Sequence, residues 1–232
     1  MTFVIGFDAD DTLWHCENHF AQAQDQFTRI LAPYQPGQIP LSRLTEIEKR
    51  NMRLYGFGVK GFMLSMIETA VDITDGRIGG DDVKKIIALG RAILEQPLEL
   101  IEDARETLEI LATHHRLLLI TKGDLLDQEA KITRSGLAPL FAGVEIVSQK
   151  DESAYRRLLA RHDVATSQFI MVGNSVPSDI LPVLALGGRA IHIPYHITAA
   201  HETVAEEQLA GTDPLRVDYI REIPDLIRTL ED

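Results

Sequence analysis

Five short, mainly apolar runs constrain the fold of this chain more than any other feature of its sequence. The runs are Phe3–Phe7, Arg116–Thr121, Val144–Val147, Gln168–Val172 and Ala190–Ile193. Runs of this length and composition are typical of buried strands in a parallel sheet. Helical patterns lie between the runs, for example between residues 101 and 111. Strands that alternate with helices predict an α/β fold built on a parallel sheet.

One long stretch interrupts this alternation and predicts an insert. Between about Glu17 and Gln96 the sequence contains helical patterns and no convincing strand. The four patterns are His19–Leu31, Leu41–Leu54, Phe62–Val71 and Asp82–Leu94. Prolines and glycines lie between them and favour helix ends there. We therefore predict an α/β core domain of residues 1–16 and 97–232, and an all-helical inserted domain of residues 17–96.

The composition excludes several classes of function. Thirty-five acidic against 23 basic residues give a net charge of −12, which argues against non-specific binding to nucleic acid or anionic membranes. No apolar stretch approaches the roughly 20 residues of a membrane helix, and the N-terminal segment lacks the basic start of a signal peptide. The single cysteine, Cys16, rules out an internal disulfide. These features predict a cytoplasmic protein without nucleic-acid or membrane partners.

Polar side chains follow four of the predicted strands at the point where each strand ends. They are Asp8 and Asp10, Thr121, Lys150 and Asp179. Because ligands of open parallel sheets bind outside the carboxyl ends of the strands, we expect these side chains to share one rim. The two carboxylates at the first strand repel each other unless a cation such as Mg²⁺ intervenes. Acids, a hydroxyl and an ammonium group together suit phosphoryl transfer.

Each of these residues has a simpler explanation when it is taken alone. An Asp-x-Asp after a strand is common in turns, and Thr121 could cap the following helix. Lys150 could be a solvated surface lysine, and Asp179 a charge near a helix start. The arrival of all of them at successive strand ends is far less expected by chance. Their order therefore favours a catalytic site.

The ordered set Asp8-x-Asp10-x-Thr12, Thr121, Lys150 and Gly173-Asn174-Ser-x-x-x-Asp179 resembles the haloacid dehalogenase superfamily over nearly the whole chain. The resemblance implies a Rossmann-like core with a mobile helical cap at the family's first insertion position. It implies that Asp8 is the nucleophile that attacks phosphorus. Asp10 would protonate the leaving oxygen and then activate the hydrolytic water.

The resemblance also implies the remaining roles. Thr121 would hydrogen-bond the transferring phosphoryl group, and Lys150 would neutralise charge on the nucleophile and the phosphate. Mg²⁺ would be held by Asp8, the backbone carbonyl of Asp10 and Asp179. Asn174 departs from the family pattern, which usually has Asp there, and brings one fewer negative charge to a metal site. Its contribution to metal binding stays open.

The second acid of the opening motif selects among activities within the family. Dehalogenases of this family lack it, because a departing halide needs no proton whereas an alkoxide does. Asp10 therefore favours a Mg²⁺-dependent phosphatase that hydrolyses a small phosphate monoester, a phosphorylated metabolite, through an aspartyl-phosphate intermediate. Lys122 and Gly123, which follow Thr121, are further candidate substrate contacts.

A glycine-rich segment in the insert supplies the last candidates. Gly56-Phe-Gly58-Val-Lys-Gly61 has the spacing of a dinucleotide-binding loop, but a helical pattern and not a strand precedes it. We interpret it as an inter-helix loop. Cap loops of the family often face the active site, so Tyr55 and Lys60 are candidate substrate contacts.

Several alternatives use the same residues. A phosphomutase, a phosphonate hydrolase or a haloacid dehalogenase could be built on this fold. The phosphonate enzymes need a cap lysine, for which Lys49 and Lys60 are the candidates. A non-catalytic regulatory protein, similar to phosphorylated receiver domains, belongs to another class. Receiver domains lack an 80-residue helical insert, but Asn174 keeps a regulatory family member open.

Overall fold

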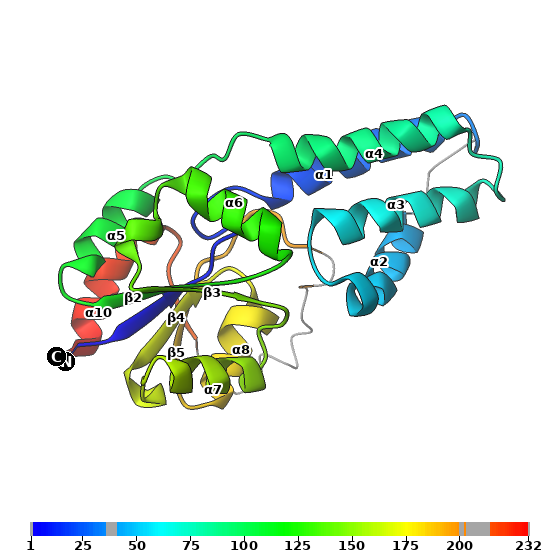
Figure 1. Cartoon of the computed structure of the whole chain (residues 1–232). Helices are drawn as coiled ribbons and strands as arrows, with labels where there is room; N and C mark the ends of the chain where they lie inside the picture. The colour runs from blue at the N-terminus through cyan, green and yellow to red at the C-terminus, as the bar shows by residue number, and fades with distance from the viewer. Residues whose placement is uncertain (1, 36–40, 200–201, 203–213, 232) are drawn as a thin grey trace. The chain divides into compact units, whose positions relative to one another are not determined.

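The structure is a computed structural model that describes residues 2–35, 41–199, 202 and 214–231. The chain divides into two compact units (Figure 1). The α/β unit contains Met1–Cys16, Leu98–Lys122 and Gln128–Asp232. The helical unit contains Glu17–Pro97 together with a short segment from much later in the chain, Gly123–Asp127.

A parallel sheet forms the centre of the α/β unit and has six strands within the described residues, in the order β3-β2-β1-β4-β5-β6. The strands are β1 (Val4–Phe7), β2 (Arg116–Lys122), β3 (Gly143–Val147), β4 (Phe169–Gly173), β5 (Arg189–His192) and β6 (Leu215–Arg216). The chain moves outward from β1 to β3 and then returns to β4 on the other side of β1. Because Phe7 pairs with both Leu119 and Val172, the carboxyl ends of β1, β2 and β4 meet at one edge.

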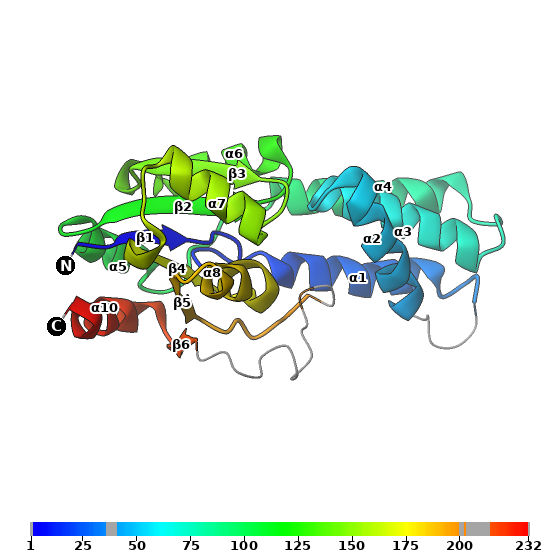
Figure 2. The ribbon, with the colours of Figure 1, turned by 90° about the horizontal axis from the view of Figure 1, so that it is seen from below.

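Helices cover both faces of this sheet, because its central strands are apolar on both sides. Leu117 and Leu119 of β2 pack with one set of helices, and Leu118 and Ile120 pack with the other. The first set is α5 (Ala104–Ala112), α6 (Leu125–Ser135) and α10 (Ile223–Glu231), and the second is α7 (Glu152–Arg161) and α8 (Leu181–Ala185) (Figure 2). Full burial of each such leucine or isoleucine contributes about 1.5–3 kcal/mol.

Four helices with their own apolar core make up most of the helical unit. They are α1 (Glu17–Leu31), α2 (Leu41–Tyr55), α3 (Val59–Ile73) and α4 (Gly80–Glu95). Helix α1 packs against α4, and α3 packs against both α2 and α4. Their shared core includes Phe27, Phe62, Met66 and Ile86, which are almost completely buried.

Two segments of the α/β unit flank residues 17–97 in sequence and lie side by side. The amide of His15 donates to the carbonyl of Glu99 at 3.0 Å, and that of Ile101 donates to the carbonyl of Leu13 at 2.9 Å. Both backbone bonds belong to the α/β unit, so the chain leaves this unit and returns to it through one hydrogen-bonded pair of segments. Short helical turns complete the described structure: η1 (Ala138–Leu140), η2 (Thr166–Gln168), the π-helical turn η3 (Val176–Ile180) and η4 (Ile220–Glu222).

The fold class predicted from the sequence is confirmed. All five predicted strands are present, and the four helical patterns of the insert form α1 to α4. The sequence prediction missed β6, which has two residues and no apolar run. Within the described parts of the chain, no helix combines the length and hydropathy needed to cross a membrane.

Candidate active site

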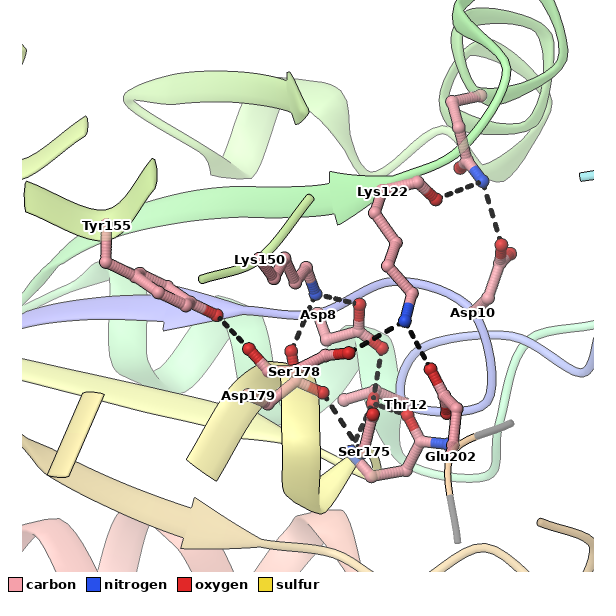
Figure 3. Close-up of polar contacts among 12 residues, drawn as sticks. Asp8, Asp10, Thr12, Lys122, Lys150, Tyr155, Ser175, Ser178, Asp179 and Glu202 are labelled. Carbon is pink, nitrogen blue, oxygen red and sulfur yellow. Dashed lines mark hydrogen bonds and ion pairs between the residues drawn. The ribbon is translucent and has the colours of Figure 1, made fainter. Parts of the chain in front are cut away.

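Three charged side chains converge at the carboxyl edge of the sheet. Asp8 directly follows β1, and its amide extends the strand by donating to the carbonyl of Val172 at 2.9 Å. The ammonium group of Lys150 forms an ion pair with the Asp8 carboxylate and another with Asp179, at 2.7 Å from Oδ1 (Figure 3). All three side chains are buried, and Asp179 completely so. The rim predicted from the sequence therefore brings these three residues together.

Burial and charge set the protonation of this triad. Burial raises the pKa of Asp179 to about 7, although the neighbouring Lys150 ammonium acts in the opposite direction. Burial likewise raises the pKa of Asp8. For Lys150 burial would lower the pKa, but the two carboxylates outweigh it and raise the pKa. With both carboxylates ionised, one ammonium leaves the cluster one negative charge in excess, which favours a further cation.

Backbone geometry places Asp179 within this cluster. A Cβ atom at Gly173 would lie 2.3 Å from Oδ2 of Asp179, so only glycine fits at the end of β4. The amide of Ser175 donates to the same oxygen at 3.0 Å. The hydroxyl of Tyr155 donates to the carbonyl of Ser178 at 3.0 Å and so fixes the residue that precedes Asp179. These two hydrogen bonds fix the π-helical turn η3, which carries Asp179.

Thr12 links Asp8 to the loop after β4. Its hydroxyl lies 3.0 Å from Oδ2 of Asp8 and 3.3 Å from Oδ1 of Asn174, and it accepts the backbone N–H of Asn174 at 3.2 Å. A hydroxyl has one proton to donate, so Asp8 and Asn174 compete for it. Asn174, which the sequence named as an uncertain metal ligand, is therefore engaged with Thr12. Asp11 completes the turn in a left-handed conformation, with φ of 63°, which Asp tolerates better than most residues.

Asp10 contacts a second lysine and not Lys150. Its carboxylate accepts hydrogen bonds from Trp14 Nε1 at 2.6 Å, Gln128 Nε2 at 2.8 Å and Lys131 Nζ at 2.7 and 2.8 Å. Burial would raise the pKa of Asp10, but the Lys131 charge and these hydrogen bonds outweigh it and lower the pKa. Asp8 and Asp10 are only two residues apart, but their surroundings shift their pKa values in opposite directions.

The end of β2 supplies the next predicted residues. Thr121 is buried in register with Ile146 of β3. The ammonium of Lys122 donates to the hydroxyl of Ser178 at 2.7 Å and pairs with Glu202 (Figure 3). Lys122 thus links the end of β2 to the turn η3. Gly123 follows with φ of 149°, a conformation that favours glycine.

The remaining predicted contacts belong to the helical unit. Tyr55 ends α2 with 55% of its surface exposed. Lys60, in the first turn of α3, forms an ion pair with Asp124 at 2.9 Å, and Gly56 and Gly58 form the predicted inter-helix turn. The roles of Tyr55 and Lys60 toward a substrate stay predictions.

The oxygen donors at the triad fit Mg²⁺. Within the described residues, no three His, Cys, Asp or Glu side chains are arranged to hold a metal by themselves. Mg²⁺ commonly uses only one or two carboxylates and completes its shell with water and phosphate. Asp8 and Asp179 supply two carboxylates, and the buried hydroxyl of Ser175 has no hydrogen-bond partner among the described residues. An all-oxygen set with an unsatisfied hydroxyl suits a hydrated hard cation.

A family model for the haloacid dehalogenase-like hydrolases matches residues 4–187, which include the triad and the entire helical insert. The chain belongs to the haloacid dehalogenase-like hydrolase family. The family resemblance predicted from the sequence is thus confirmed. A haloacid dehalogenase-like hydrolase from Xanthomonas campestris shares 39% sequence identity with this chain and superimposes with a TM-score of 0.87. The match covers 99% of this chain and 91% of that one.

More distant members of the family share the fold alone. A 2-haloacid dehalogenase from Pseudomonas syringae pv. tomato has 22% identity and a TM-score of 0.65, over 99% of this chain and all of that one. The hydrolase YfnB from Bacillus subtilis, in a structure bound to magnesium, has 16% identity and a TM-score of 0.66, over 97% and 98% of the two chains. No curated protein matches the chain.

Sequence reasoning missed several side chains of this site. They are Gln128, Lys131, Tyr155, Ser178 and Glu202. Gln128 and Lys131 had a usable signal, since polar residues three apart on a helix share one face. Glu202 follows no strand or motif, so its contact with Lys122 depends on tertiary structure alone.

Proposed function

We propose that this hydrolase is a Mg²⁺-dependent phosphatase that acts on a small phosphate monoester through an aspartyl-phosphate intermediate. One observation carries the proposal. A buried Asp8, which shares the Lys150 ammonium with Asp179, is followed two residues later by a second acid that has its own hydrogen-bond partners. A halide leaving group needs no such acid, whereas an alkoxide does. Asp10 therefore supports phosphate-ester chemistry over dehalogenation.

The side chains of the site have distinct roles in this reaction. Asp8, oriented by Thr12 and Lys150, attacks phosphorus, and Asp10 protonates the departing oxygen. Asp10 then takes a proton from the water that attacks the phosphorus of the aspartyl-phosphate, which releases phosphate and regenerates Asp8. Thr121 and Lys150 bind the phosphoryl oxygens through both steps.

The metal contributes charge to this site. When bound, Mg²⁺ would be held by Asp8, Asp179 and the backbone carbonyl of Asp10, and would stabilise charge on the phosphoryl group. The side-chain oxygen of Asn174 contacts the hydroxyl of Thr12, so Asn174 would contribute to the metal site only through Thr12. The protein supplies the orientation of the carboxylates through Lys150 and Gly173.

The helical unit would act as a cap that sets substrate choice. We propose that it excludes water during the reaction and contributes Tyr55 and Lys60 to substrate recognition, and that Lys122 and Gly123 recognise the substrate at the end of β2. The proposed substrate is a small phosphorylated metabolite in the cytoplasm, without a nucleic-acid or membrane partner. The net charge of −12 supports this assignment.

A phosphate-release screen tests the proposed function. Wild-type protein with Mg²⁺ is incubated with p-nitrophenyl phosphate and a panel of nucleotides, sugar phosphates and phosphoglycolate, beside Asp8→Asn as the control. We expect release that requires both Mg²⁺ and Asp8. The absence of turnover above the control on the whole panel would refute the proposal, and halide release from 2-haloacids would identify a dehalogenase instead.

A further inference from the structure

Both oxygens of the Asp10 carboxylate are held by side chains from outside its own loop. We propose that Gln128 and Lys131 of α6 are positioning residues that hold this carboxylate for proton transfer. The inference rests on the proposed phosphatase function and adds residues to it. Neither Gln128 nor Lys131 belongs to the sequence motifs that predicted the site.

The contacts of Asp10 fix both the position and the rotation of its carboxylate. Lys131 Nζ lies 2.8 Å from Oδ1 and 2.7 Å from Oδ2, so it bridges the two oxygens. Trp14 Nε1 donates to Oδ1 at 2.6 Å, and Gln128 Nε2 donates to Oδ2 at 2.8 Å. With donors on both oxygens, the carboxylate cannot turn about its own axis without the loss of a charge-assisted hydrogen bond.

Gln128 also ties Asp10 to the end of β2. Its Nε2 lies 3.3 Å from the carbonyl of Lys122 as well as 2.8 Å from Asp10, and these two acceptors determine which end of the amide is nitrogen. The opposite end, Oε1, is buried and has no hydrogen-bond partner among the described residues. One helix thus aligns the acid with the strand end that carries Thr121.

These contacts would contribute little to the stability of the fold. An unsatisfied buried oxygen costs about 1–3 kcal/mol, and a buried ion pair contributes little to stability once desolvation is counted. The side chain of Lys131 is only 12% exposed, and that of Asp10 is 25% exposed. Packing does not explain why the protein keeps these costly contacts. The positioning of a reactive carboxylate does.

The positioned carboxylate transfers one proton in each half of the reaction. In the first half, the Asp8–phosphorus bond forms and the bond from phosphorus to the leaving oxygen breaks. Asp10, which has taken up a proton from solvent or from the water of the preceding cycle, gives that proton to the leaving oxygen. In the second half, the water–phosphorus bond forms, the Asp8–phosphorus bond breaks, and Asp10 takes the proton of the water. A misplaced carboxylate therefore slows both halves.

Substrates with different leaving groups distinguish positioning from general damage. p-Nitrophenolate departs without a proton, so Lys131→Met should still form the aspartyl-phosphate from p-nitrophenyl phosphate but hydrolyse it slowly. We expect a burst of p-nitrophenol and a phosphorylated protein by mass spectrometry. With the best alkyl phosphate of the panel, we expect turnover to fall about 10²–10⁴-fold without phosphoenzyme accumulation.

Two variants serve as controls for this experiment. Lys131→Arg should recover part of the alkyl phosphate activity, because a guanidinium group can bridge both carboxylate oxygens. Arg134→Met removes another cation from the same helix and should behave as wild type. Equal losses on both substrates without phosphoenzyme, or full activity of Lys131→Met, would overturn the positioning role.

The single tryptophan gives a readout that needs no activity. Trp14 donates to Asp10, so release of that carboxylate from Lys131 should change the fluorescence emission of Lys131→Met but not of Arg134→Met. If wild-type protein releases no phosphate, the proposed function fails while this spectrum still tests the contact. Unchanged emission in Lys131→Met would show that Lys131 does not hold Asp10.

Discussion

At the scale of single residues, competition for one proton determines how Asp8 is presented. The Thr12 hydroxyl lies within reach of both Asp8 and Asn174, and it can donate to only one of them at a time. An amide is a weaker acceptor than a carboxylate. Asn174 therefore leaves the proton of Thr12 to Asp8, at the cost of one negative charge near the metal site.

Asn174→Asp tests this balance. We expect Mg²⁺ affinity, measured by isothermal titration calorimetry, to increase about tenfold because of the added charge, equivalent to about 1.4 kcal/mol. We also expect kcat to fall, because the new carboxylate draws the Thr12 proton from Asp8. Asn174→Ser, which adds no charge, is the control. Unchanged affinity would exclude any electrostatic contact between position 174 and the ion.

Glu48 provides a second test at this scale, away from the site. Burial raises its pKa to about 7, so between the ordinary value of 4.5 and pH 7 the folded protein binds more protons than the unfolded chain. The stability contributed by this proton is present below pH 4.5 and is lost as the pH rises through 7. Glu48→Gln should therefore raise the melting temperature at pH 8 by several degrees. It should change nothing at pH 4.5, and an equal shift at both values would contradict the assignment.

At the scale of elements, the ends of strands carry the chemistry, and the sequence revealed most of them. Apolar runs predicted β1 to β5, and the polar residues after them predicted the Asp8, Lys150 and Asp179 cluster, because register brings strand ends to one edge. The orientation of Asp10 could not be predicted, since it depends on how α6 packs against the sheet. β6 escaped detection because two residues give no periodicity.

Gly173→Ala tests the joint between β4 and η3. A Cβ atom there would lie 2.3 Å from Oδ2 of Asp179, so the carboxylate must leave Lys150. We expect kcat/KM to fall at least ~100-fold, with a smaller change in the far-UV circular dichroism spectrum. Gly80→Ala, where a Cβ atom meets nothing within 4 Å, should retain activity. Full activity of Gly173→Ala would show that the position of Asp179 is unimportant.

At the scale of the whole molecule, ion binding should stabilise the folded chain in a pH-dependent way. A ligand that binds only the folded state raises the melting temperature, and metal ligands must be deprotonated. Because the pKa of Asp179 is raised to about 7, protons compete with Mg²⁺ below that value.

The melting temperature therefore gives a simple test of the metal site. We expect saturating Mg²⁺ to raise it more at pH 8 than at pH 6, as measured by differential scanning calorimetry. The shift should disappear in Asp179→Asn at both pH values. A shift that is equal at the two pH values in wild-type protein would place the ion elsewhere.

Chemical trapping of the intermediate tests whether Asp8 is the nucleophile. Wild-type protein is mixed with Mg²⁺ and its best phosphate ester and quenched with borohydride, which reduces an aspartyl-phosphate to homoserine. Peptide mass spectrometry then locates the reduced residue. We expect homoserine in place of Asp8, and none in samples without substrate. Efficient turnover with Asp8 unmodified, or reduction at another aspartate, would contradict it.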